Sequence, residues 1–343
     1  MKNRLSKFTI HDLAADLSLA PGTVSKILNG KGNIPTETRA RVLQRAKEVG
    51  YVANHSARVL KAEHTWTIGI VFSDIASFGL EHPFFGSIIQ AFKNFIEDKG
   101  YEMVFIPKKI GEQEQTYLQW ATNKSVDGVL LLTGDLNAKD IQELIHAEIP
   151  CVSVDMVDPS LATIISDDHQ GIELIFKHYL QLGFHSIYAY SGSTLSRAYQ
   201  QRSEAFEKLT KMHKTKRPQE AYFVTDRYGV QHYYEQGLLW IQSWKEKPEA
   251  IIAFSDDIAM GLIKALTELG YRVPEDISVS GYDDIQFASL FSPALTTIKQ
   301  DKKRIAETAA IKLLDIIEKK EVSKGVTTVP VQLMIRQSTK RIK

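Results

Sequence analysis

The first fifty residues carry apolar side chains at the three- and four-residue spacing of short amphipathic helices. Thr9 lies three residues before Asp12, a spacing that predicts a capping box at the start of the first helix. Pro21 suits the first turn of a second helix, where its missing N–H needs no partner, and Gly50 ends a third helix. The predicted inward positions are Ile10, Leu13, Ala14, Leu17, Val24, Ile27, Leu28, Val42, Leu43, Ala46 and Val49.

Beyond residue 65, short aliphatic runs alternate with longer stretches of helical periodicity. This alternation is typical of βαβ units with parallel sheets. It occurs twice, with a boundary near residues 160–165, so we expect an α/β core of two similar lobes behind an all-α head. The predicted strands are 66–72, 101–106, 128–132, 151–154, 186–190, 221–224, 250–254 and 278–280; the predicted helices are 83–99, 113–124, 138–147, 170–182, 199–213, 230–244 and 257–269.

Charge is distributed unevenly along the chain. The 343 residues carry a net charge of +1, yet residues 1–62 hold eleven Lys or Arg and four Asp or Glu, a net charge of +7. The remainder therefore carries −6. A basic head on a mildly acidic body indicates that the head meets a polyanion while the body has another role.

Composition excludes several classes of protein. A hydrophobic share of 43% and a charged share of 24% are typical of a globular protein and argue against disorder. Cys151 is the single cysteine, so no internal disulfide is possible, which fits a reducing compartment. The N-terminus lacks the apolar core of a signal peptide, and the apolar runs are too short to span a bilayer. We therefore expect a cytoplasmic protein without a membrane partner.

The motifs of common enzyme and metal sites are missing from the sequence. It contains no Walker loop, Gly-x-Ser-x-Gly elbow, His-Glu-x-x-His or Cys-x-x-Cys. We therefore expect no catalytic residues, no cofactor and no metal site. An enzyme or a free sugar-binding receptor on the same α/β core is the alternative, and the basic head argues against the receptor.

The helical head has the pattern of a helix-turn-helix, in which two short helices joined by a tight turn are braced by a third. The second helix would enter the major groove, where Thr23, Ser25 and Lys26 offer hydrogen-bond donors to phosphates or base edges. Many small helical bundles share this pattern, so by itself it is a weak signal. The exposed residues at the start of this helix are Ala20, Pro21, Gly22, Thr23, Ser25 and Lys26.

Five segments of the head form a spaced motif that runs along the whole head: residues 9–14 (TIHDLA), 23–30 (TVSKILNG), 38–39 (TR), 50–51 (GY) and 54–60 (NHSARVL). On these segments the head resembles the lactose-repressor (LacI/GalR) family of bacterial transcription regulators. Two positions depart from the family pattern. Ser18 stands where the family usually has Gly in the inter-helix turn, and Ala20 stands where it usually has Ser.

The resemblance implies a repressor that acts as a homodimer on a pseudo-palindromic operator, because one helix-turn-helix reads a half-site. It divides the chain into a DNA-binding domain over 1–52, a hinge helix over 53–63 and a core over 64–343. Leu60 would be an apolar wedge in the minor groove, or else part of an amphipathic linker that packs on the core. The further implied DNA contacts are Thr9, Asn29, Asn54, Ala57 and Arg58.

The core shows a resemblance to the same family, whose core looks like a periplasmic sugar-binding protein. The matching segments include 167–171 (DDHQG), 256–261 (DDIAMG), 273–279 (VPEDISV), 281–284 (GYDD) and 293–300 (PALTTIKQ). The resemblance implies that helix 301–319 packs on the first lobe and strand 326–336 on the second. The implied lobes are about 64–162 with 293–322, and about 163–292 with 323–343.

Candidate ligand-binding residues follow the carboxyl ends of the predicted strands, where open parallel sheets bind ligands. Carboxylates and a guanidinium fork, together with aromatic rings, suit a polyhydroxylated ligand. The resemblance implies that Arg202 and Asp283 contact the effector, and it leaves the choice between Arg227 and Tyr228 open. The predicted effector site comprises Asp74, Phe84, Phe85, Arg202, Arg227, Tyr228, Asp256 and Asp283.

Several of these residues have a structural alternative. Asp168, Asp256 and Asp257 follow strand ends, where a carboxylate often caps the next helix instead. Ser196 and Ala198 stand where some purine-binding relatives place polar contacts, so we expect a carbohydrate effector rather than a purine. A protein corepressor is the alternative regulator.

One loop and one aromatic pair leave further alternatives. The loop over 73–82 is a few residues longer than relatives usually have; its Phe78, Glu81 or His82 either shapes specificity or reflects ordinary loop variation. One of Phe84 and Phe85 is expected in the core rather than in the site.

Overall fold

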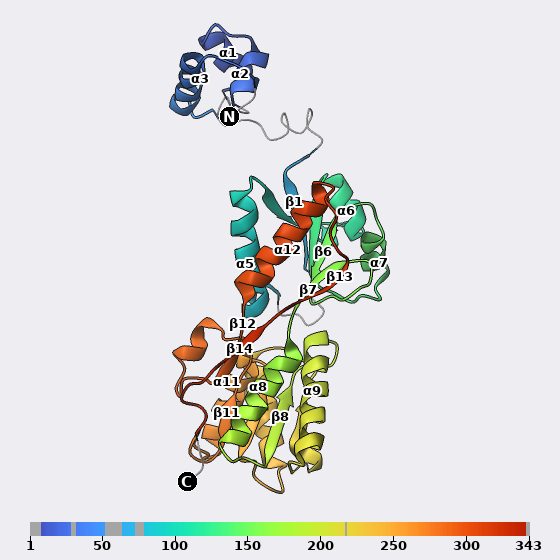
Figure 1. Cartoon of the computed structure of the whole chain (residues 1–343), viewed down its shortest axis with the longest axis vertical. Helices are drawn as coiled ribbons and strands as arrows, with labels where there is room; N and C mark the ends of the chain where they lie inside the picture. The colour runs from blue at the N-terminus through green and yellow to red at the C-terminus, as the bar shows by residue number, and fades with distance from the viewer. Residues whose placement is uncertain (1–7, 29–31, 52–63, 73–78, 217, 341–343) are drawn as a thin grey trace. The chain divides into compact units, whose positions relative to one another are not determined.

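A computed structural model describes residues 8–28, 32–51, 64–72, 79–216 and 218–340 of the chain. The chain divides into two units, Met1–Thr65 and Trp66–Lys343. Each unit packs around hydrophobic cores of its own, and its helices and strands are labelled in Figure 1. None of the helices in these ranges has both the length and the apolar character that a bilayer crossing needs.

The head unit folds as three helices around one small core, as predicted. Leu13, Val24 and Val42 come from the three helices and are fully buried against one another. Leu43 was predicted to face inward but is 48% exposed, because one residue beyond Val42 the helix has turned away from the core. The helices are α1 (Ile10–Asp16), α2 (Pro21–Leu28) and α3 (Thr36–Glu48).

The start of α1 and the turn after it have local causes in the sequence. The backbone N–H of Asp12 donates to Thr9 Oγ1 over 3.2 Å, and the backbone N–H of Thr9 donates to the Asp12 carboxylate over 2.8 Å. This is the predicted capping box. Ser18, in the turn to α2, has a φ of 54° in the left-handed region that favours glycine. The turn therefore keeps a glycine-like conformation without glycine.

The first lobe is a six-stranded sheet, parallel throughout, in the order β13-β7-β6-β5-β1-β2. Helices α5 and α12 lie side by side on one face, and α6 and α7 cover the other (Figure 1). The elements are β1 (Thr67–Phe72), β2 (Glu102–Phe105), β5 (Gly128–Thr133), β6 (Cys151–Val154), β7 (Ala162–Ser166), β13 (Gly325–Val329), α5 (Pro83–Asp98), α6 (Tyr117–Asn123), α7 (Lys139–Ile145) and α12 (Lys302–Ile317).

Part of the helix predicted over 113–124 is a hairpin instead. Strands β3 (Lys109–Ile110) and β4 (Gln113–Glu114) pair across a turn at Gly111, whose φ is +60°. Helix α6 begins after Thr116, which forms a second capping box with Gln119. The turn glycine and this cap set the boundary that the apolar periodicity placed too early.

The second lobe is a four-stranded parallel sheet in the order β11-β10-β8-β9. Helices α8 and α9 pack on one face, and α10 and α11 pack on the other. The elements are β8 (Ile187–Ser191), β9 (Tyr222–Val224), β10 (Ala250–Ala253), β11 (Ser278–Ser280), α8 (Asp168–Gln181), α9 (Arg197–His213), α10 (Val230–Gln242) and α11 (Asp256–Glu268).

The chain crosses between the lobes three times, at positions that differ from the predicted lobe bounds. Strand β7, which was not predicted, pairs with β6 and β13 in the first lobe, so the first crossing follows Ser166 rather than residue 162. Strand β12 (Thr297–Gln300) pairs with β14 (Val331–Met334) in the second lobe. The prediction that strand 326–336 packs on the second lobe is therefore wrong for β13 and right for β14. The backbone N–H and C=O groups of β13 pair with β7, and those of β14 pair with β12, so each strand joins the lobe of its hydrogen-bond partner.

Candidate DNA-binding surface and effector site

The start of α2 presents the residues that were predicted to contact DNA. Ala20, Pro21, Gly22 and Lys26 are exposed, and Thr23 and Ser25 are partly buried. Thr9 is exposed as well, and its side chain is part of the capping box of α1. Five predicted contacts lie outside the described residues: Asn29, Asn54, Ala57, Arg58 and Leu60.

Arg202 on α9 is buried between the second-lobe sheet and helix α8, and only 4% of it is exposed. Its Nε donates to Asp168 over 2.9 Å, and its Nη1 donates to the carbonyl oxygen of Phe254 over 2.5 Å. Its guanidinium carbon lies 3.6 Å from the centroid of the Tyr282 ring. Within the described ranges, Nη2 makes no hydrogen bond. The side chain is therefore held rigidly, and the N–H groups of Nη2 remain to donate to a ligand.

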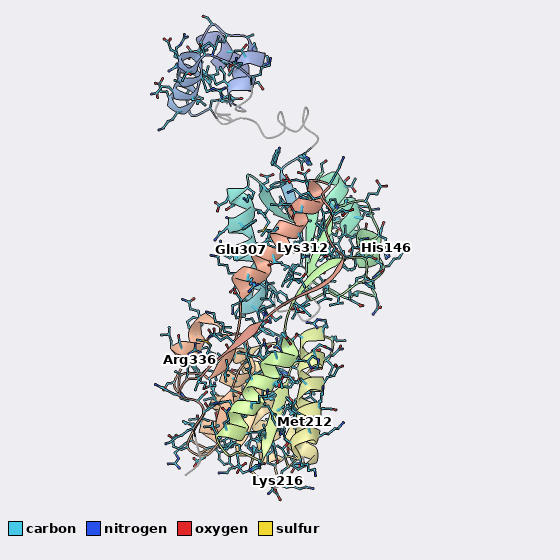
Figure 2. All side chains as sticks on the ribbon, in the orientation of Figure 1. His146, Met212, Lys216, Glu307, Lys312 and Arg336 are labelled. Atoms are coloured by element: carbon cyan, nitrogen blue, oxygen red, sulfur yellow. The ribbon has the colours of Figure 1, made fainter. Side chains whose placement is uncertain are left out.

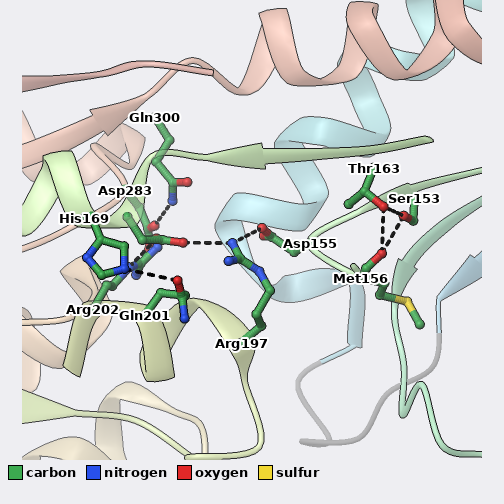
Figure 3. Close-up of polar contacts among 11 residues, drawn as sticks. Ser153, Asp155, Met156, Thr163, His169, Arg197, Gln201, Arg202, Asp283 and Gln300 are labelled. Atoms are coloured by element: carbon green, nitrogen blue, oxygen red, sulfur yellow. Dashed lines mark hydrogen bonds and ion pairs between the residues drawn. The ribbon is translucent and has the colours of Figure 1, made fainter. Parts of the chain in front are cut away.

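Asp283 follows β11 and lies near Arg202 (Figure 3). Its carboxylate accepts from Gln300 Nε2 over 2.5 Å, and Lys302 Nζ donates to its carbonyl oxygen. Its φ of 115° is a conformation that non-glycine residues rarely adopt. Burial raises the pKa of Asp283 to about 6, against the opposing effect of Arg202 and Lys302. A strained, buried carboxylate beside a buried guanidinium is typical of a binding site.

Asp256 is fully buried and both of its carboxylate oxygens are occupied. Oδ2 accepts from the backbone N–H of Ile285 over 2.8 Å, and Oδ1 accepts from Thr297 Oγ1 over 2.5 Å. Ser255, not Asp256, caps α11. Asp256 therefore joins α11 to strand β12, and neither the ligand role nor the capping role describes its contacts.

Aromatic side chains from both lobes meet beside Arg202 and Asp283. His82 of the first lobe stacks on Tyr228 of the second, with ring centroids 4.8 Å apart, and lies 5.1 Å from the Phe85 ring. The hydroxyl of Tyr228 donates to Asp257. Burial lowers the pKa of His82 to about 4, and the charge of Arg202 acts in the same direction, so the imidazole is neutral near pH 7. The stack places Tyr228, rather than the exposed Arg227, at the interface of the lobes.

The aromatic pair after Pro83 separates as expected into one core residue and one residue near the site. Phe84 is 4% exposed within the first-lobe core, whereas Phe85 is partly buried and contacts Phe72 and His82. Asp74 lies outside the described residues.

Two charged residues that the sequence analysis left out of the effector site connect it to the other lobe. Arg197, at the start of α9, donates from Nη2 to Asp155 over 3.2 Å (Figure 3). The same nitrogen donates to Asp168 over 2.9 Å. Asp155 directly follows β6 of the first lobe, and its position at a strand end was a usable signal. Arg197 carried no signal, because nothing in its spacing distinguishes it from an exposed helix residue.

Comparison with known proteins assigns the family. Residues 9–54 match the model of bacterial regulatory proteins of the lacI family, and residues 176–339 match a periplasmic binding protein-like domain. The HTH-type transcriptional repressor PurR of Pectobacterium carotovorum is 33% identical, over 96% of this chain and 96% of its own length. The chain belongs to the lacI family of bacterial regulatory proteins. PurR of Vibrio vulnificus is 30% identical, over 97% of this chain and 99% of its own length.

Solved structures of the lacI family show the same fold. A lac repressor dimer bound to operator and the anti-inducer ONPF superposes with a TM-score of 0.83 at 25% identity, covering 97% of this chain and 99% of that one. A lacI-family regulator from Enterococcus faecium with bound ribose superposes with a TM-score of 0.69 at 24% identity, covering 81% of this chain and 100% of that one. The chain is a DNA-binding transcriptional repressor with a ligand-binding core, and it is not an enzyme.

Proposed function

We propose that the chain represses transcription as a homodimer on a pseudo-palindromic operator, and that a carbohydrate bound between the core lobes controls its operator affinity. The repressor names of its relatives, and the operator-bound dimer among its structural neighbours, support the DNA and dimer parts of this proposal. The exposed start of α2 supplies the surface that would enter the major groove.

The observation that carries the effector proposal is that Arg202 and Asp283, both buried, lie close enough for the charge of each to act on the other. Arg202 keeps Nη2 and Asp283 keeps one carboxylate oxygen beyond the contacts that hold them in place. A donor and an acceptor at fixed positions suit neighbouring hydroxyl groups of a sugar, and the rings of His82 and Tyr228 offer an apolar face for its C–H groups.

Control of operator affinity then follows from linkage. A ligand that contacts both lobes binds one arrangement of the lobes more tightly than another and shifts the population toward it. If that arrangement changes the spacing of two DNA-binding heads, operator affinity changes by the ratio of the two ligand affinities.

The DNA part is tested by selecting operators from a random duplex pool and measuring affinity against salt. We expect log affinity to fall linearly with log salt, with a slope of about −5 or steeper for two half-sites. Lys26→Ala should weaken binding about tenfold, since a base or phosphate contact contributes about 1–3 kcal/mol. Lys47→Ala removes the same charge from the exposed side of α3 and should change affinity little. A flat salt response would overturn the proposal.

The effector part is tested by thermal shift with a panel of monosaccharides, disaccharides and purine bases. A ligand at a hundred times its Kd stabilises the folded chain by about 2.7 kcal/mol, which is easily detected. We expect a sugar to give this shift and Asp283→Asn to abolish it. Asp276→Asn, the same change at a residue that pairs with exposed Arg272, should leave the shift intact. A thermal shift with purine bases and with no sugar would overturn the carbohydrate proposal and identify a purine as the effector.

A further inference from the structure

An ion pair joins the two lobes of the core. Arg197 Nη2 lies 3.2 Å from Asp155 Oδ1, and the two side chains are 23% and 17% exposed. Asp155 follows β6 of the first lobe, whereas Arg197 is the first residue of α9 in the second. Figure 3 shows Arg197 extending from α9 toward Asp155. The pair is partly shielded from water, so it is stronger than an exposed ion pair.

The same guanidinium also connects this pair to the effector site. Arg197 Nη2 donates to Asp168 Oδ2 over 2.9 Å, and Asp168 Oδ1 accepts from Arg202 Nε over 2.9 Å. Asp168 is 2% exposed at its side chain, so its two oxygens fix both guanidinium groups in place. A displacement of Arg197 would therefore displace Arg202 as well, because both guanidinium groups bind the carboxylate of Asp168.

A second feature of Arg197 indicates that the contact can respond to a ligand. Its Nε is buried and has no hydrogen-bond partner within the described part of the chain. A buried donor without a partner is unfavourable, and an acceptor from a bound hydroxyl group would remove that penalty. The stacked rings of His82 and Tyr228 form another contact between the lobes.

We infer that Arg197 is a lobe-coupling residue: its ion pair with Asp155 stabilises the closed arrangement of the two lobes, and Asp168 ties that arrangement to the position of Arg202. Opening the lobes separates Asp155 from Arg197 and leaves Arg197 with Asp168 alone. The regulatory consequence rests on the proposed function, because lobe closure matters for the operator only if the chain is a ligand-controlled repressor.

Distances between the lobes, measured by electron spin resonance on the full chain, test the inference without operator or effector. Spin labels are attached at Glu143→Cys on α7 and Met212→Cys on α9, both exposed (the helices are marked in Figure 1, and Met212 in Figure 2). Labelled chain is diluted with unlabelled chain so that each assembly holds one label pair. Cys151 stays in place, because burial raises the pKa of its thiol to about 12 and keeps it unreactive.

Three variants are compared on this labelled background. Arg197→Gln and Asp155→Asn each remove one member of the pair, and asparagine tolerates the left-handed φ of 61° at Asp155. The third combines both changes. We expect each single variant to raise the population at long distances roughly tenfold, between the small effect of an exposed pair and the large effect of a buried one. The double variant should equal the singles, because all three break one contact.

Arg272→Gln is the matched control. It breaks an ion pair with Asp276 that lies wholly within the second lobe, so the distance distribution should stay as in the parent chain. Unchanged distances in all three variants, or additive effects of the two single changes, would overturn the inference. Thermal melting of each variant shows that it is folded, and Asp155→Asn keeps the test valid if Arg197→Gln fails to fold. If the three variants show the expected distance changes but the parent chain does not bind any operator selectively, the result counts against the proposed function alone.

Discussion

Asp167 and Asp168 are neighbours with the same side chain, and the structure gives them different energetic roles. Asp167 caps α8 by accepting from the backbone N–H of Gln170 over 2.9 Å. Asp168 is the shared counterion of Arg197 and Arg202, at 2.9 Å from each, and its side chain is 2% exposed. Removing the charge of Asp168 leaves two guanidinium groups without their common partner.

The expected cost of Asp168→Asn follows from this burial. Removing one partner of a buried ion pair costs about 3–5 kcal/mol. Asparagine keeps one acceptor oxygen, so we expect about 3 kcal/mol of lost unfolding free energy, at the lower end of that range. Asp167→Asn should cost a few tenths of a kcal/mol, because asparagine and aspartate cap helices about equally well.

Urea unfolding at pH 7, followed by tryptophan fluorescence and far-ultraviolet circular dichroism, measures both variants. With a slope of about 3 kcal/mol per molar urea, Asp168→Asn should lower the midpoint by about 1 M and Asp167→Asn should leave it nearly unchanged. Coincidence of the two probes shows that one transition is being compared. Equal midpoints for the two variants would refute the assignment of Asp168 as the counterion of both arginines.

Three other substitutions test the packing, a titration and a turn. Gly281→Ala places a methyl group 2.2 Å from Asp256 Oδ1 and 2.8 Å from a Leu295 methyl, so urea unfolding should show a loss of about 2 kcal/mol or more. Burial lowers the folded-state pKa of His82 from 6.5 to about 4, so its neutral ring contributes stability that is complete above pH 6.5 and is lost as the pH falls toward 4. The urea midpoint of His82→Gln should therefore fall less than that of the parent chain over this range. Ser18→Gly relieves a φ of 54° and should raise the melting temperature of the head unit by stabilising it by about 1 kcal/mol; a lower melting temperature would contradict the strained turn.

Elements with a strong local signal were predictable from the sequence. The capping box at Thr9 and the proline at the start of α2 determine their helix starts from the chemistry of one or two side chains. The apolar strands of both sheets were found because parallel strands are buried on both faces and form continuous apolar runs.

Strand β7 and the return strand β13 were harder, because their partners are distant in sequence. In β7, Thr163 interrupts the apolar run, and its buried hydroxyl pairs with Ser153 Oγ over 2.7 Å in the neighbouring strand. Strand β13 alternates between partly buried and exposed residues at the sheet edge, so the sequence does not indicate which lobe it joins. The placement of both strands depends on pairing with strands that are distant in the sequence, and local periodicity carries no information about that pairing.

The site shows the same division between local and distant information. Arg202 and Asp283 were predicted as effector contacts through the family motif, and the structure brings the two buried side chains near each other. Asp256 follows a strand end as a ligand-binding carboxylate does, but distant Thr297 occupies it. Arg197 acquires its role through Asp155 on the other lobe, a pairing that only the folded chain reveals.

The most direct test of the account is operator affinity of the full chain with and without the sugar that the thermal-shift panel identifies. Coupling between two sites of this kind changes affinity by about 5- to 150-fold, and we predict a change within that range. Asp283→Asn should retain operator binding and lose the response. An operator affinity that stays the same at saturating sugar would contradict control of DNA binding by a ligand between the lobes.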